Sequence, residues 1–212
     1  MHKKSVNGIA FVGLMVLAGC GGGGGNGGTD PVEPGTNVTQ LRNDFDALSL
    51  AVLQANDMVS QDLQTTGSIT YEGIMTIDVE SYDAAMQGTF NMTIGFAGDG
   101  EIGGTAKDFL EHDDRDSDTD ALPSVAGTVD FSNGSIRRTD DRVPTFNADF
   151  AGTLAIPVDA LDAPANTDIV VAGDLVGQIR VGAIAAGFTF DTATPAGAAP
   201  IEINGELVAL EQ

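Results

Sequence analysis

The sequence predicts an all-β domain preceded by one N-terminal α-helix, and three observations predict it. Apolar and polar residues alternate with a period of two over 88–96 and over several similar segments, as strands with one buried and one wet face require. Dipeptides typical of tight hairpin turns separate some of these segments. One segment alone, about 39–58, repeats its apolar residues with the period of a helix.

Each expected strand carries a row of apolar residues at alternate positions. In 88–96 every position of this row is apolar. In 101–107 the row consists of Ile102, Gly104 and Ala106. The expected strands cover residues 67–79, 88–96, 101–107, 125–131, 135–138, 146–156, 169–180, 183–190 and 201–209. Eight or nine strands are therefore expected.

Two dipeptides predict hairpin turns between neighbouring strands. Asp99-Gly100 predicts a two-residue turn before 101–107, and Asn133-Gly134 predicts a second turn before 135–138. Many short strands with frequent turns are typical of a β-sandwich or an up-and-down barrel. A membrane-spanning barrel is disfavoured because only 6% of the residues are aromatic, too few for girdles at two bilayer interfaces.

The expected helix belongs to an N-terminal helical segment, residues 37–62, which precedes a barrel or sandwich domain over 63–212. Asn37, followed three residues later by Gln40, resembles a capping arrangement. The apolar stripe of the helix consists of Leu41, Phe45, Leu48 and Val52. This stripe is expected to lie on the wall of the domain or to cover one of its ends, and a partner-binding helix is the alternative.

The N-terminus has the order of a lipoprotein signal peptide. Lys3 and Lys4 precede the apolar run 9–18, which is too short to span a bilayer comfortably. The run ends in Leu17-Ala18-Gly19-Cys20, which resembles the lipobox of bacterial lipoprotein precursors. The resemblance implies that residues 1–19 are removed and that Cys20 is the lipid attachment site. An ordinary secretory signal or an uncleaved anchor is the alternative.

Residues 20–36 are expected to be a flexible tether. The segment 21–28 is nearly all glycine, and the prolines and acids that follow it cannot bury apolar surface. Gly21, not Asp, follows the lipid-bearing cysteine, and in the sorting rule of enteric bacteria this favours the outer membrane. Cys20 is the sole cysteine, so the mature chain forms no internal disulfide.

The charge of the chain excludes several classes of partner. The chain has a formal charge of −22, and loss of Lys3 and Lys4 with the signal makes it two units more negative. Such a chain repels nucleic-acid phosphates and anionic lipid headgroups, so no nucleic-acid partner is expected. A basic partner or a divalent cation would suit it.

No catalytic set is visible, and we expect no enzyme. Only His112 remains after the signal is removed, so zinc sites of several His and Cys ligands are excluded by count. Carboxylates two residues apart, at Asp114, Asp116, Asp118 and Asp120, present oxygens like the first half of a calcium loop. Counted from Asp114 or Asp116, that loop lacks both the turn glycine and the closing Glu. A weak calcium site or an acidic patch for a basic partner is one interpretation, and a solvated loop is the simpler one.

A small basic cluster follows the second hairpin signal. It consists of Arg137, Arg138 and Arg142, flanked by Asp140 and Asp141. We expect these arginines to pair with neighbouring acids.

Glycine-rich strand motifs carry a further resemblance. Residues 88–104 have the form of a strand with a Phe, a glycine turn, and a short apolar residue before further glycine, and 127–136 repeat that form. Glycines recur along 146–154 and 173–187 as well. Over about 65–210 these motifs resemble the C-terminal β-barrel of transferrin-binding protein B and its small surface-lipoprotein relatives. The resemblance implies an eight-stranded antiparallel up-and-down β-barrel.

The function that follows from these features is binding at a membrane. We expect a lipid-anchored protein of the outer membrane, exposed at the cell surface, which binds an unidentified protein or small molecule in nutrient or metal acquisition. The chain lacks the aromatic-Gly-Pro element of the iron-uptake relatives in 181–190, which weakens any transfer of transferrin binding. The alternative is a structural lipoprotein that faces the periplasm. No cofactor is expected apart from weakly bound calcium.

Overall fold

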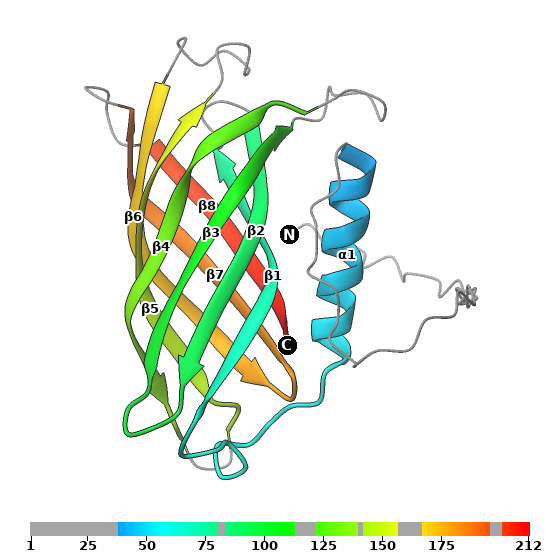
Figure 1. Cartoon of the computed structure of the whole chain (residues 1–212), viewed down its shortest axis with the longest axis vertical. Coiled ribbons are helices and arrows are strands. Elements are labelled where there is room, and N and C mark those ends of the chain that lie inside the picture. The colour runs from blue at the N-terminus through cyan, green and yellow to red at the C-terminus, as the bar shows by residue number, and fades with distance from the viewer. Residues whose placement is uncertain (1–37, 80–83, 113–121, 140–141, 157–166, 196–200) are drawn as a thin grey trace, which may run out of the picture.

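In the part of the chain that the structure describes, eight strands form one closed barrel and one helix lies outside it (Figure 1). This computed structural model describes residues 38–79, 84–112, 122–139, 142–156, 167–195 and 201–212. The elements are α1 (Val38–Gln54), β1 (Ser68–Val79), β2 (Ala84–Gly95), β3 (Glu101–His112), β4 (Ser124–Arg137), β5 (Thr145–Ile156), β6 (Thr167–Arg180), β7 (Ala183–Pro195) and β8 (Ile201–Glu211). Each strand pairs antiparallel with the next, and β8 pairs with β1. The eight-stranded antiparallel barrel is therefore confirmed, and the sandwich alternative is wrong.

The connections distinguish the two ends of the barrel. The segments 96–100, 138–144 and 181–182 join strands at one end, which we call the turn end. The start of β1 and the last residue of β8 also lie there, because Tyr71 is paired with Glu211. The other four connections, including the one between β3 and β4, join strands at the opposite end.

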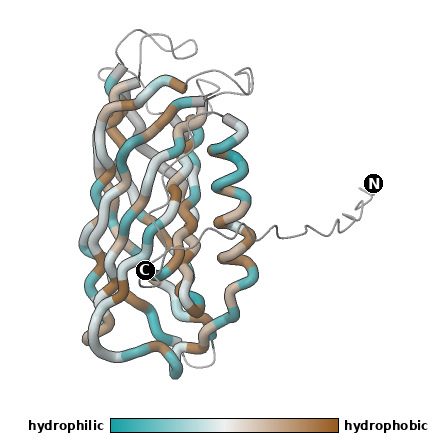
Figure 2. Tube along the Cα trace, turned by 45° about the vertical axis from the view of Figure 1, so that its right-hand side comes forward, coloured by the Kyte–Doolittle hydropathy of each residue, from teal (hydrophilic) through white to brown (hydrophobic). Residues whose placement is uncertain are grey.

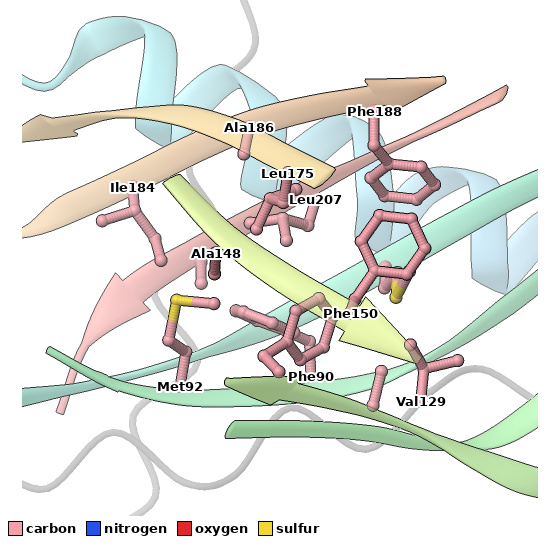
Figure 3. Packing of buried hydrophobic residues seen from close by; sticks show 14 of the residues in the cluster. Phe90, Met92, Val129, Ala148, Phe150, Leu175, Ile184, Ala186, Phe188 and Leu207 are labelled. Atoms are coloured by element: carbon pink, nitrogen blue, oxygen red, sulfur yellow. The ribbon is translucent and has the colours of Figure 1, made fainter. Parts of the chain in front are cut away.

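The side chains that point into the barrel form a hydrophobic core among the described residues. Hydrophobic and hydrophilic residues alternate along the strands (Figure 2), and the apolar rows predicted from the sequence point inward. Four phenylalanines cross the interior from β2 to β7 with ring centroids 5.3, 6.3 and 5.5 Å apart in the order Phe90, Phe131, Phe150 and Phe188. Such spacings are favourable for aromatic pairs. Figure 3 shows Phe150 and Phe188 among methionine, leucine and alanine side chains from several strands.

Glycines in the inward rows make room for these rings. A Cβ atom on Gly205 would come within 3.0 Å of Phe188, which lies directly opposite it on β7. Gly177 stands in the same relation to Phe146 on β5. At these two positions the ring occupies the space that a side chain on the opposite residue would need.

The predicted hairpin at Asn133-Gly134 is wrong, because β4 runs through these residues without reversing. The pairing of β4 with β5 shifts between Ser132 and Ser135, which marks a β-bulge, and Asn133 takes a positive φ of 52°. Its Nδ2 donates a hydrogen bond of 3.0 Å to Oδ2 of Asp149 on β5. The dipeptide supplies the backbone geometry of a bulge here, so the strand count is eight rather than nine.

The hairpin predicted at Asp99-Gly100 is confirmed, although its loop is longer than two residues. Gly95 and Glu101 form the last pair of β2 and β3, so five residues connect the strands. Gly100 N donates to Ala97 O at 3.0 Å, which closes the turn. β3 extends to His112, beyond the predicted end at residue 107, because a bulge with Asp108 at φ 56° keeps it paired.

The helix lies along the outer wall of the barrel, which is one of the two placements expected (Figures 1 and 2). It packs against β8 and also contacts β1 and β7. Its inner face buries Leu48 and Val52 against Ile74, Ala183 and Val208, which all point outward from their strands. α1 ends at Gln54, four residues before the end predicted from the sequence. Among the described residues, no helix is long and apolar enough to span a bilayer.

We predict that the inward glycines are required for stability. Gly205→Ala should lower the free energy of unfolding by about 1–3 kcal/mol, because the added methyl group overlaps the Phe188 ring. Urea unfolding followed by circular dichroism measures the difference.

The matched control is Gly187→Ala on the adjacent strand, where the nearest heavy atom to an added Cβ is 3.9 Å away. This variant should stay within about 0.5 kcal/mol of the wild type. Equal stabilities for the two variants would show that the Phe188 ring does not need the space.

Candidate binding surface

The two sets of site residues predicted from the sequence lie outside the described residues. Cys20 and the tether precede Val38, where the description begins. The carboxylates at Asp114, Asp116, Asp118 and Asp120 fall in the connection between β3 and β4, in the segment 113–121. Within the described part of the chain, no group of three or more His, Cys, Asp or Glu side chains could hold a metal ion. The calcium site therefore stays a prediction.

The interior of the barrel is occupied by the core. Buried side chains from all eight strands fill it, and most of them are apolar. Glu111 on β3 is an exception, since it stands in the inward row and is 3% exposed.

Arg138 closes the turn end of the barrel. Its Nη1 donates to Gly98 O at 2.9 Å, and its Nη2 donates to Phe96 O at 2.9 Å and to Gln64 O at 3.3 Å. The guanidinium therefore joins the end of β4 to the β2–β3 turn and to the segment before β1. Its described partners are therefore backbone carbonyls, and Asp140 and Asp141, the acids expected to pair with this cluster, lie outside the described residues.

Arg180 holds the end of α1 on the barrel. Its Nη1 lies 3.4 Å from Asp57 Oδ1 and donates to Ala55 O at 3.4 Å. The next residue, Val181, donates its backbone N–H to Asn56 O at 3.2 Å. The C-terminal end of α1 is thus fixed beside the β6–β7 turn.

Tyr71 is the buried titratable group at this end. Burial raises the pKa of Tyr71 well above its ordinary value of 10.0, and the nearby Glu211 carboxylate raises it further. The side chain is 1% exposed and points into the core. It acts as a structural residue whose phenol stays protonated at neutral pH.

A shallow groove of about 380 Å³ runs over the outer faces of β6, β7 and β8. Small residues form its floor, because Ala185 and Gly187 point outward on β7. Val176 on β6 and Val208 on β8 flank the floor, and Glu206 supplies the one formal charge in the lining. Val208 also contacts the helix, so the groove borders the seam between α1 and the barrel.

No pattern in the sequence predicted this groove. Its outward residues belong to the rows that were interpreted simply as the wet faces of strands. The available signal was that Val176, Ala185 and Val208 stand at outward positions of their strands. These residues are less polar than is usual for a solvated face. No local pattern in the sequence predicts that these three strands lie together beside the helix.

We predict that Arg138 stabilises the turn end. Arg138→Ala should lower the free energy of unfolding by about 1–3 kcal/mol, since three carbonyls lose a charged donor. The neighbouring Arg137 is exposed, and Arg137→Ala should change the stability by less than about 0.5 kcal/mol. Thermal or urea unfolding of both variants measures the effect, and equal losses would contradict the structural role.

We predict a loss of stability at alkaline pH that depends on Tyr71. The folded protein holds the phenol proton more tightly than the unfolded chain. The contribution of protonated Tyr71 to the free energy of unfolding is therefore complete below pH 10 and is lost as the pH rises above it. The added slope should approach about 1.4 kcal/mol per pH unit. Unfolding measured from pH 8 to 12 in the wild type and in Tyr71→Phe tests this, and identical slopes would contradict it.

Comparison with known proteins supplies no relative for this chain. No protein-family model, no curated protein and no solved structure matches it. The likeness of residues 65–210 to the barrel of transferrin-binding protein B therefore rests on the short glycine motifs alone.

Proposed function

We propose that this chain is a lipid-anchored outer-membrane lipoprotein, exposed at the cell surface, whose barrel presents a binding surface to a protein or small-molecule ligand. The observation that carries the proposal is the position of the single cysteine. Cys20 follows a basic start, an apolar run and small residues, and is followed directly by a glycine-rich tether. A lipid on this residue would hold the domain close to a membrane yet free to turn.

The polarity of the barrel supports an anchored rather than a membrane-spanning protein. Barrels that span the outer membrane turn an apolar band outward and keep a polar interior. In this barrel the large apolar side chains are inside. Outward positions of β2, β4 and β5 carry Asn91, Thr128 and Asp149, all of them exposed.

A closed barrel is a suitable scaffold for binding from its surface. Every strand is paired on both sides, so no free edge is available for unwanted strand addition. Close packing of the described core side chains makes the wall rigid, and rigid walls present loops and side chains at low entropic cost. The resemblance to the small surface lipoproteins supports a role in nutrient or metal acquisition. The formal charge of −22 favours a basic ligand.

Protease treatment of intact cells tests the proposed location. If the protein is exposed at the surface, proteinase K should remove it from intact cells as completely as from lysed cells. Protection until lysis would instead favour the alternative, a structural lipoprotein facing the periplasm. A periplasmic protein of the same cells serves as the control for leakage.

Metabolic labelling with a palmitate analogue tests the anchor separately. The wild-type chain should take up label, and Cys20→Ala should take up none and leave the membrane fraction. Label in Cys20→Ala would contradict the assignment of the lipid to this residue.

A further inference from the structure

Two Asn-Gly dipeptides lie within the described strands, Asn133-Gly134 on β4 and Asn204-Gly205 on β8. This dipeptide is chemically labile, because a glycine has no side chain to hinder attack of its backbone nitrogen on the amide of the preceding asparagine. The attack requires a main chain that can rotate, and its product must then be reached by water. The two sites differ in both respects, so the fold determines which of them reacts.

Asn133 stands outside both ladders of its own strand. On one side, Ser132 and Asn133 of β4 lie opposite the single residue Gly103 of β3. On the other side, the pairing with β5 passes from Ser132 directly to Ser135. The extra residue of a bulge is left unpaired. The main chain at Asn133 is therefore held by fewer ladder hydrogen bonds than a regular strand.

Asn204 lies in a regular ladder on both sides. It is paired with Asp78 on β1 and with Thr189 on β7, and the register is unbroken through its immediate neighbours. Asn204 is also half-buried, whereas Asn133 is exposed to water. Rotation of the main chain at Asn204 would have to open the pairing with two strands, so it requires local unfolding of the sheet.

The bulge on β4 itself requires these two residue types. Asn133 has a φ of 52°, a conformation that asparagine adopts more readily than most residues with a side chain. A Cβ atom on Gly134 would overlap Cβ of Ile102 on β3. The geometry that keeps β4 in the barrel thus selects the labile dipeptide, and a larger residue at Gly134 would displace the neighbouring strand.

An acid at position 133 would meet two carboxylates. Nδ2 of Asn133 donates its 3.0 Å hydrogen bond to Oδ2 of Asp149 on β5. Asp149 in turn lies directly opposite Asp174 on β6, and both acids are exposed. Loss of the amide removes a donor from Asp149 and adds a third negative charge beside the pair. Like charges at neighbouring positions of adjacent strands are destabilising.

We propose that Asn133 is a site of spontaneous deamidation, and that this modification weakens the barrel as the protein ages. The backbone nitrogen of Gly134 forms a bond to Cγ of Asn133, the Cγ–Nδ2 bond breaks, and ammonia leaves with the proton of that nitrogen. Water then opens the resulting succinimide ring to aspartate or to isoaspartate, which lengthens the main chain at the bulge. This inference is independent of the proposed binding role.

The test incubates the mature chain, residues 20–212, prepared without lipid, at mildly alkaline pH. Peptide mapping by mass spectrometry follows both sites, since conversion of an amide to an acid raises the mass of its peptide. The peptide that contains Asn133 should accumulate product at least about tenfold faster than the peptide that contains Asn204. The matched control is the same incubation in denaturant, where both dipeptides are released from the fold and should react at similar rates.

The variant Asn133→Asp tests the effect on stability. Its midpoint of thermal unfolding should lie about 2–4 °C below that of the wild type, and high salt should reduce this difference by screening the exposed charges. Asp149→Asn in the same chain should restore most of the loss. The control variant Asn147→Asp adds a charge to the same strand but keeps the acceptor for Ser135 Oγ, and it should lower the midpoint less.

Other results would overturn the proposal. Equal rates at the two sites of the folded chain, or no product at Asn133, would show that the bulge does not create a reactive site. A difference of the same size in denaturant would show that the local sequence, not the fold, sets the rates. An Asn133→Asp variant that melts with the wild type would show that the modification leaves the barrel unchanged.

Discussion

The rest of the structure depends on filling a narrow, closed interior with a single set of side chains. Eight strands leave just enough room inside for side chains, and a void in such a core costs stability while an excess atom strains the wall. The four phenylalanines from Phe90 to Phe188 cross this space, and inward glycines such as Gly205 provide the clearance they need. Ring and glycine are paired across neighbouring strands, so the size of one determines the other. The register of the barrel follows from these pairs.

The outer surface of the barrel also makes contacts of its own. One part of that surface is already used by α1, which covers outward apolar residues such as Ile74 and Val208. Arg180 and the hydrogen bond between Val181 and Asn56 hold the end of the helix at the turn end. The groove over β6 and β7 is the next part of the wall, and small residues such as Ala185 and Gly187 form its floor. The proposed anchor would keep that surface near a membrane without fixing its direction.

The fold was predictable from the sequence to an unusual depth, because the alternation of residues directly reflects which face of each strand is buried. The inward row of 88–96 was correctly predicted, and so was the apolar stripe of the helix. The errors came from local backbone geometry. Asn133-Gly134 can build either a hairpin or a bulge, since both need a positive φ, and only the pairing of β4 with β5 decides between them. The hydrogen bond from Arg138 to Gly98 O, in the turn of the preceding hairpin, is a contact that no sequence pattern indicated.

The sequence by itself determined the class of the domain, the helix, the inward rows and the residues that point to export and lipid attachment. These features depend on local patterns. The patterns are the periodicity of apolar residues, the turn dipeptides, and the order of charged and apolar residues near Cys20. Only the tertiary structure decided that β8 closes on β1, that α1 lies on the wall rather than over an end, and that Val176, Gly187 and Glu206 share one groove. These residues come from three strands and are neighbours across the sheet, so their relation depends on register and closure. Register and closure are properties of the whole barrel, and no short stretch of sequence contains them.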